Sequence, residues 1–289
     1  MADDPPQELV RARFLSANRV AELEALINAC RKREGLEVHP RLMGPSEYLG
    51  AETNWFLYYR DGTLAAVAAL ATDERAEFLS VVYPEHRRRG IGRALLAAAM
   101  DECRRRGITI LQLLCDDVSS TGTAFAEAMG ARYHSSRHRM RLDATAVSPS
   151  SSPGEAIAMD PADLGDLDTL VRLCAASADE SVERLRTRVV RWLVKPTQRF
   201  YIGRLADQAI GVVRSIFYRE IADIAFFRVL PGFEGYGFDR QILESASAVL
   251  IDEGKTVWLE AKTDDDTLLL YRSCGFRTIS TYRHYELQA

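Results

Sequence analysis

The sequence lacks the cysteine patterns that build zinc sites or disulfide frameworks. Its five cysteines are isolated, none lies in a C-x-x-C pair, and their number is odd. This usage favours buried, reduced thiols over disulfides or a metal centre. The chain also has no apolar run near the ~18 residues that a membrane-spanning helix needs, and its first residues form no apolar leader. These absences predict no metal site, no membrane association and a cytoplasmic location.

A strong charge of one sign is absent as well. The 37 basic and 41 acidic residues give a formal net charge of −4, which offers no electrostatic case for binding nucleic acid. With 47% hydrophobic and 27% charged residues, the composition is that of an ordinary globular protein. A length of 289 residues predicts about two domains.

One stretch, Leu79–Leu96, carries the most chemical information. Leu79–Val82 is apolar and β-branched, which predicts a buried strand, and Pro84 ends it because proline has no N–H for a ladder. Three arginines and two glycines follow in Arg87–Gly92, directly before a helix-forming run. The start of a helix presents unpaired N–H groups and positive dipole charge. The stretch therefore predicts a site for a phosphate-rich anion.

Two common nucleotide motifs do not fit this stretch. A Walker loop requires Gly-Lys-Ser/Thr, whereas Gly92 is followed by Arg93. A dinucleotide fingerprint requires a third glycine, and Leu95 occupies that place.

An internal repeat organises the rest of the chain. Three landmarks recur at offsets of 147, 147 and 145 residues: Pro84 and Pro231, Gly90 and Gly237, and Gly130 and Gly275. Residues 143–154 between the copies are rich in Ser, Pro, Ala and Thr, which is typical of a linker. We therefore expect an N-terminal domain at 1–142, a linker at 143–154 and a C-terminal domain at 155–289.

Periodicity and turn signals predict the same mixed α/β unit twice, with helices packed around one mixed sheet. In the first copy we expect strands at 8–15, 54–60, 63–71, 75–82, 108–115 and 131–142, and helices at 18–32, 93–106 and 121–129. In the second copy we expect helices at 161–176, 182–193, 239–252 and 268–273, and strands at 200–205, 209–217, 221–230, 256–261 and 277–287.

At this point the chain resembles the GNAT superfamily of acyl-CoA-dependent N-acetyltransferases. The family signature, Gln/Arg-x-x-Gly-x-Gly/Ala after the fourth strand, is matched by Arg87–Gly92, and the usual Val-x-Pro precedes it as Val82-Tyr83-Pro84. The resemblance covers Glu8–Leu142 well and Glu155–Leu287 in architecture. Two such domains in one chain resemble the tandem GNAT proteins, a group that includes mycothiol synthase-like enzymes.

The resemblance implies acetyl-CoA as cosubstrate and direct transfer of its acetyl group to an amine. The backbone of the strand would bind the pantetheine arm, and the amides of the following turn would bind the pyrophosphate. The implied cofactor-binding residues are Ser80, Val81, Val82, Arg87, Arg88, Arg89, Gly90, Ile91, Gly92, Arg93 and Ser119. Ser119 follows the strand at 108–115, and it could equally cap the helix after it.

The catalytic groups are less sharply predicted. Glu77 lies early in the strand before the loop, where several family members place a base, although a plain surface carboxylate fits as well. Tyr271 fits the family's Tyr-x-x-x-Gly-Phe ending, where the tyrosine can act as general acid, but the first copy has Ala126 at that position. Tyr83 and Tyr133 are possible substitutes for the acid, with aromatic packing as the alternative.

The second copy departs from the signature. Glu234 stands where Arg87 stands, and Asp239 stands where Gly92 stands. Two carboxylates beside a pyrophosphate would repel it. Two functions are consistent with this pattern: an N-acetyltransferase that holds acetyl-CoA in its first domain, or a non-catalytic tandem scaffold that senses acyl-CoA or binds a partner. The acceptor amine, small molecule or peptide, and the choice between monomer and homodimer stay open.

Overall fold

The chain folds into two compact units. The computed structural model describes residues 7–35, 42, 52–72, 75–143, 157–175, 181–263 and 267–289. The first unit comprises residues 1–137 and 280–289, and the second comprises residues 138–279. This division differs from the predicted one in two places. The last ten residues of the chain belong to the first unit, and His138–Leu142 belongs to the second. Apart from Asp143, the predicted linker lies outside the described residues.

The first unit is a twisted sheet in the order β1-β2-β3-β4-β5-β12. All of its adjacent strands are antiparallel except β4 and β5, which are parallel. Its strands are β1 (Gln7–Ala12), β2 (Trp55–Arg60), β3 (Thr63–Ala71), β4 (Ala76–Val82), β5 (Ile110–Asp116) and the end of β12 (Phe276–Gln288). Its helices are α1 (Ala17–Glu34), the 3-10 turn η2 (Pro84–His86), α2 (Ile91–Arg105) and α3 (Ser120–Ala128).

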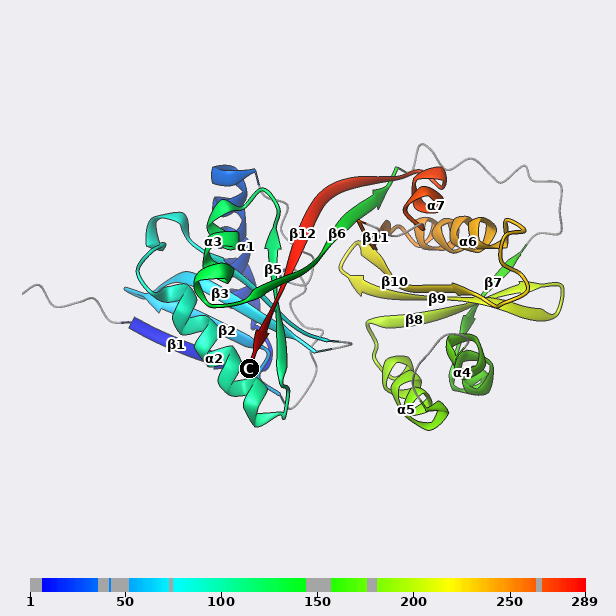
Figure 1. The fold of residues 1–289 in the computed structure, drawn as a ribbon, viewed down its shortest axis with the longest axis horizontal. Helices are drawn as coiled ribbons and strands as arrows, with labels where there is room; N and C mark the ends of the chain where they lie inside the picture. Colours follow the sequence, from blue (N-terminus) through cyan, green and yellow to red (C-terminus); the bar gives the residue numbers. More distant parts are fainter. Residues whose placement is uncertain are drawn as a thin grey trace, which may run out of the picture. The chain divides into compact units, whose positions relative to one another are not determined.

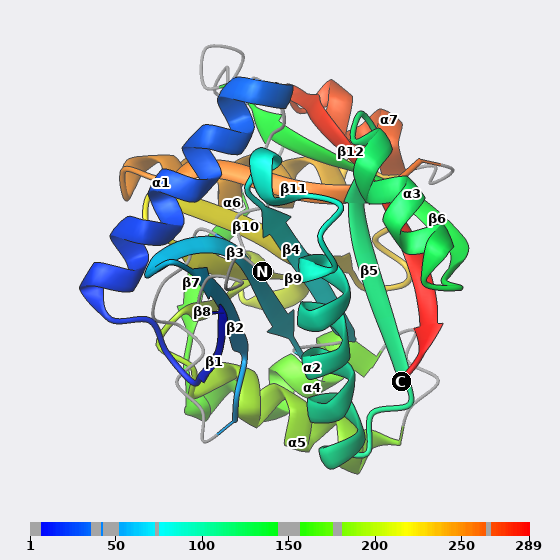
Figure 2. The ribbon, with the colours of Figure 1, turned by 90° about the vertical axis from the view of Figure 1, so that its left-hand side faces the viewer.

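Helices cover both faces of this sheet, as Figure 2 shows. One face packs α1 through residues such as Leu23 and Ile27. The other face packs α2 and α3 through residues such as Leu95 and Ala126. Successive strand residues point to opposite faces, so Phe78 joins the α2 side while Leu79 joins the α1 side. Alternation along β4 therefore determines which helices each of its side chains faces.

The second unit repeats this plan in the order β6-β11-β10-β9-β8-β7. Its strands are β6 (Arg132–Leu142), β7 (Ala158–Ala162), β8 (Gln198–Leu205), β9 (Gln208–Tyr218), β10 (Ile221–Val229) and β11 (Thr256–Lys262), with β10 and β11 parallel. The 3-10 turn η4 (Leu164–Asp166) leads into α4 (Leu167–Ala175), which packs with α5 (Val182–Leu193) in one core. The helices α6 (Phe238–Asp252) and α7 (Thr267–Ser273) pack in the second hydrophobic core of this unit.

The predicted fold class, two mixed α/β units in tandem, is confirmed. One element differs from the prediction: the helix was expected to begin at Pro161, but Pro161 and Ala162 are the last residues of the strand β7 (Ala158–Ala162). Pro161 is tolerated there because β7 is an edge strand that pairs only with β8.

The last strand is the larger surprise. It begins in the second unit, but Tyr282–Gln288 pairs antiparallel with Ile110–Asp116 of β5. Figure 1 shows this strand, in red, running beside β5. Sequence similarity between the copies identifies a strand, but it does not say which sheet the strand completes.

Candidate functional site

The site begins where β4 and β5 separate. The parallel pairing runs through Ala76–Leu111, Glu77–Gln112 and Phe78–Leu113, and no further pair of these two strands is formed within the described residues. On its other edge β4 stays paired with β3 as far as Val82. The Tyr83 N–H donates to Ala65 of β3, so by alternation the backbone groups of Ser80 and Val82 point away from β3, toward the gap.

The turn after β4 presents helix N–H groups to the same region. Arg88 and Gly90 have φ values of 62° and 84°, left-handed conformations that fold the backbone tightly before α2. The first N–H of α2 to bond within the helix belongs to Ala94, which donates to Gly90 at 3.0 Å. The N–H groups of Ile91, Gly92 and Arg93 precede it and are oriented for an anion.

A groove of about 500 Å³ runs over this turn. The end of β4, the start of α2 and one side of α3 line it, together with Cys30 and Glu34 of α1. Gly92 sits against α3, where a Cβ at that position would lie 3.2 Å from the Phe125 ring. A glycine is therefore favoured here by close packing of α2 on α3.

A smaller cavity of about 110 Å³ continues from the groove into the sheet. The two spaces share five lining residues: Ser80, Val81, Ser119, Gly122 and Phe125. Some of its walls belong to the α2 side of the sheet, such as Phe78, and others to the α1 side, such as Leu79. The cavity therefore connects the two faces through the gap between β4 and β5.

Comparisons with known proteins agree with this geometry. Residues 21–131 match the model of the acetyltransferase (GNAT) family. Residues 21–131 form a GNAT domain. No curated protein sequence matches the chain.

Solved structures resemble the chain over nearly its whole length. A GCN5-related N-acetyltransferase from Sphaerobacter thermophilus is 16% identical, with a TM-score of 0.75 over 98% of this chain and 95% of its own. A tandem GNAT protein from the clavulanic acid biosynthesis pathway is 17% identical, with a TM-score of 0.72 over 98% of both chains. A GNAT-family acetyltransferase from Colwellia psychrerythraea is 11% identical, with a TM-score of 0.61 over 98% and 99%. At these identities the likeness shows a shared fold.

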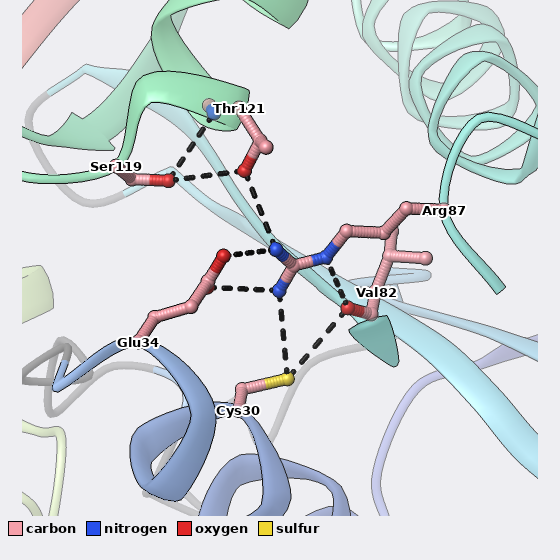
Figure 3. A network of polar contacts seen from close by, with 7 residues as sticks. Cys30, Glu34, Val82, Arg87, Ser119 and Thr121 are labelled. Carbon is pink, nitrogen blue, oxygen red and sulfur yellow. Dashed lines mark hydrogen bonds and ion pairs between the residues drawn. The ribbon is translucent and has the colours of Figure 1, made fainter. Parts of the chain in front are cut away.

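Within the GNAT domain, Arg87 is bound by protein groups (Figure 3). Its guanidinium forms a two-pronged ion pair with Glu34, with Nη2 donating to Oε2 at 2.9 Å. Its Nε donates to the Val82 carbonyl at 3.0 Å, and Nη1 lies 3.4 Å from Thr121 Oγ1. The hydrogen bond that Arg87 donates to Glu34 raises the pKa of Arg87 further. Arg87 thus connects the end of α1 to the turn before α2.

Cys30 completes this network. Its Sγ lies 3.6 Å from the Val82 carbonyl and 3.9 Å from Arg87 Nη2. Burial raises the pKa of the Cys30 thiol despite the neighbouring guanidinium, so the thiol keeps its proton. The pair Cys30 and Glu34 lies one turn apart on α1, a spacing visible in the sequence once the partner turn is known.

The other predicted cofactor residues fall into two groups. Ser80, Val81, Val82, Arg88, Gly90, Ile91, Gly92, Arg93 and Ser119 line the groove with Arg87. Arg89 is exposed and is not among the lining residues of the described chain. Ser119 also caps α3, because the Gly122 N–H donates to its Oγ at 3.2 Å. Both interpretations of Ser119 therefore hold in the structure.

Glu77 lies inside the sheet rather than on its surface. It is 8% exposed and stands in register with Gln112 of β5, on the face that packs α1. Gln112 donates to Glu286 at 3.1 Å, and its amide oxygen lies 3.4 Å from Nδ1 of His284. Glu77 is thus a buried carboxylate in a polar row beside the gap, and it is not among the described residues that line the groove or the cavity.

The three candidate tyrosines are dispersed. Tyr83 is half-buried beside the α1 core, with its ring 5.8 Å from that of His86. Tyr133 is 58% exposed and hydrogen bonded to Ser136 at 2.9 Å. Tyr271 packs edge-on against Phe276 in the second unit's core. None of the three lines the groove or the cavity of the described residues.

The sequence did not reveal Asp116 and Tyr282, two polar residues that line the through-sheet cavity. Tyr282 belongs to the second copy, and only the pairing of β12 with β5 brings it to the GNAT domain. Among the described residues, no helix is long and apolar enough to cross a membrane, and no group of side chains is arranged to hold a metal ion.

Proposed function

We propose that the protein transfers the acetyl group of acetyl-CoA to an amine, and that its first unit carries both the cofactor site and the chemistry. The observation that supports this most strongly is the continuity of the groove at the start of α2 with the cavity between β4 and β5. A long cosubstrate with an anionic middle and a reactive end requires such a pair of spaces.

In this proposal the N–H groups of Ile91, Gly92 and Arg93 bind the pyrophosphate, with Arg88 and Arg93 adding charge. Arg87 positions the turn through Glu34 and does not bind phosphate itself. The backbone of Ser80 and the N–H of Val82 bind the pantetheine arm along the edge of β4, while the Val82 carbonyl stays with Arg87. The thioester would then end in the through-sheet cavity.

Glu77 acts as the general base from the α1 face of the sheet, directly or through one water. The amine attacks the thioester carbonyl carbon once its proton is removed, the C–N bond forms, and the C–S bond breaks.

The test is release of free CoA thiol from acetyl-CoA in the presence of an amine panel, with the acetylated product identified by mass spectrometry. We expect turnover with at least one amine, and we expect Arg88→Glu to raise the KM for acetyl-CoA at least tenfold. Binding of acetyl-CoA without turnover on any amine would support the non-catalytic sensor instead.

A further inference from the structure

The end of the chain reaches the centre of the GNAT domain. Tyr282 stands opposite Asp116 in the β12–β5 ladder, and both residues line the through-sheet cavity. Neighbouring contacts fix this register: the Asp117 N–H donates to Thr281 at 2.8 Å, and Arg283 pairs with Asp117 at 2.5 Å. Tyr282 is 6% exposed, so its ring is held within the sheet rather than in solvent.

The cavity is the place where a thiolate would leave, and a leaving thiolate needs a proton. Besides Tyr282, the protic groups that line the cavity are Ser80, Cys115, Asp116 and Ser119. Burial raises the pKa of Cys115 to about 12, and its side chain packs in the α2 core, the face opposite to that of Tyr282. A carboxyl group such as that of Asp116 is ordinarily ionised at neutral pH and has no proton to give.

The two serines are poorer donors. An aliphatic hydroxyl is a much weaker acid than a phenol, and Ser119 Oγ already accepts the Gly122 N–H at 3.2 Å. The phenol of Tyr282 is therefore the lining group whose ordinary acidity suits proton donation at neutral pH. Ala126 of α3, at the position where the family pattern places its tyrosine, offers no proton.

We propose that Tyr282, supplied by the last strand of the chain, is the general acid of the reaction. This inference rests on the proposed acetyl transfer. As the C–S bond breaks, its electron pair passes to sulfur, and the Tyr282 O–H bond breaks to give the proton to that sulfur, which yields the CoA thiol. The tyrosinate regains a proton from solvent, which receives the one that the base removed from the amine.

The decisive variant is Tyr282→Phe, which keeps the ring and removes the proton. We expect kcat to fall about 100-fold with little change in the KM for acetyl-CoA, and the fall in kcat at alkaline pH to disappear. The matched control is Tyr285→Phe on the same strand, which points to the opposite face and packs in the α2 core, and which we expect to leave kcat within about twofold.

A second measurement does not depend on turnover. In protein labelled at tyrosine Cζ, the resonance assigned to Tyr282 by its loss in Tyr282→Phe should move when CoA is added, while that of Tyr285 should stay. Replacing Tyr282 with a ring-fluorinated tyrosine, whose phenol is more acidic, should shift the alkaline limb of kcat to lower pH.

The outcomes separate this inference from the proposed function. If the unsubstituted protein acetylates no amine, the proposed function fails. If it does, but Tyr282→Phe retains kcat and the alkaline limb, or the Tyr282 resonance ignores CoA, Tyr282 is not the acid and the acetyltransferase stands.

Discussion

Each unit has a buried carboxylate at the same point of its parallel strand pair, but the side chains around the two carboxylates differ. Glu77 stands one residue before the last parallel pair, Phe78–Leu113, and Asp223 stands one residue before Ile224–Leu259. Asp223 forms an ion pair with Arg139 of β6 at 2.8 Å, both side chains being nearly fully buried.

In the first unit the place of Arg139 is taken by His284, which lies 145 residues further on, as Gly275 does from Gly130. His284 meets Gln112 in the polar row that also contains Glu77. A guanidinium is always charged, whereas an imidazole can be neutral. Burial alone would lower the pKa of Arg139, but the carboxylates of Asp223 and Glu260 outweigh it, and the pKa is raised. One unit therefore neutralises its buried carboxylate with a guanidinium, whereas the other places its buried carboxylate in a row of polar side chains.

The turns that follow these strands share a backbone conformation and differ in their charged side chains. Both α2 and α6 begin after a glycine in the left-handed region, Gly90 at 84° and Gly237 at 83°. Arg87, Arg88 and Arg89 precede the first glycine, whereas Glu234, Gly235 and Tyr236 precede the second. Asp239 replaces Gly92, and Arg93 alone keeps an arginine counterpart, Arg240, which pairs with Glu244. The same turn backbone is thus present twice, but a run of three arginines precedes it in the first unit and a glutamate is part of it in the second.

The largest expected effect is on kcat, when the two buried carboxylates are neutralised one at a time. Glu77→Gln should lower kcat about 1,000-fold, because it removes the base while keeping the shape of the side chain. Asp223→Asn, at the matching position, should leave kcat within about twofold in folded protein. Steady-state kinetics of both variants measure this. Equal losses in the two variants would show that the carboxylates share a structural role.

The second prediction concerns stability. Arg139→Met should leave Asp223 as an uncompensated buried charge and lower the free energy of unfolding by about 3–5 kcal/mol. Adding Asp223→Asn should recover part of this loss, because the double variant buries no charge. Chemical denaturation measures both. A loss below about 1 kcal/mol in Arg139→Met would contradict a structural ion pair.

The third prediction concerns a buried carboxylate, Glu102 of α2, that has no counterpart at the matching position of α6. Glu102 of α2 is almost fully buried and pairs with Arg105 and Arg106, whereas position 249 of α6, 147 residues further on, is valine. The hydrogen bond from Arg105, opposed by burial and assisted by Arg106, lowers the pKa of Glu102 from 4.5 to about 2. A carboxyl whose folded pKa is depressed contributes stability above its unfolded pKa and loses it as the pH falls through the folded value.

Glu102→Gln should therefore lower the unfolding free energy by about 3 kcal/mol at pH 7, since one pKa unit corresponds to ~1.4 kcal/mol. The difference from the unsubstituted protein should shrink between pH 4.5 and pH 2. Asp101→Asn, at an exposed neighbouring pair, serves as control and should change stability by less than about 0.5 kcal/mol. A pH-independent difference for Glu102→Gln would refute the electrostatic explanation.

The smallest expected effect tests the charge of the turn. Gly92→Asp gives the first unit the residue of the second and should weaken acetyl-CoA binding about 30-fold through repulsion of the pyrophosphate. Gly92→Ala makes the same contact with the Phe125 ring without the charge and should weaken binding only a few-fold. Equal affinities for the two variants would assign the effect to packing alone.

The sequence predicted the repeated α/β unit and the strand, turn and helix within Leu79–Leu96, because each depends on local patterns of glycine, proline and apolar residues. The anion site in that turn and its loss in the second copy stay predictions. The sequence could not predict the role of Arg87, since its partners Glu34 and Cys30 lie more than 50 residues away. Tyr282 was missed for a stronger reason: strand similarity is local, whereas the choice of sheet for β12 depends on long-range pairing with β5.

The central claim is that acetyl-CoA binds in one unit only, and calorimetric titration tests it most directly. The account predicts one molecule bound per chain. Gly90→Glu should abolish binding and Gly237→Glu should leave it intact, although both glycines have the same backbone conformation. Two molecules bound per chain, or loss of binding in Gly237→Glu alone, would contradict it.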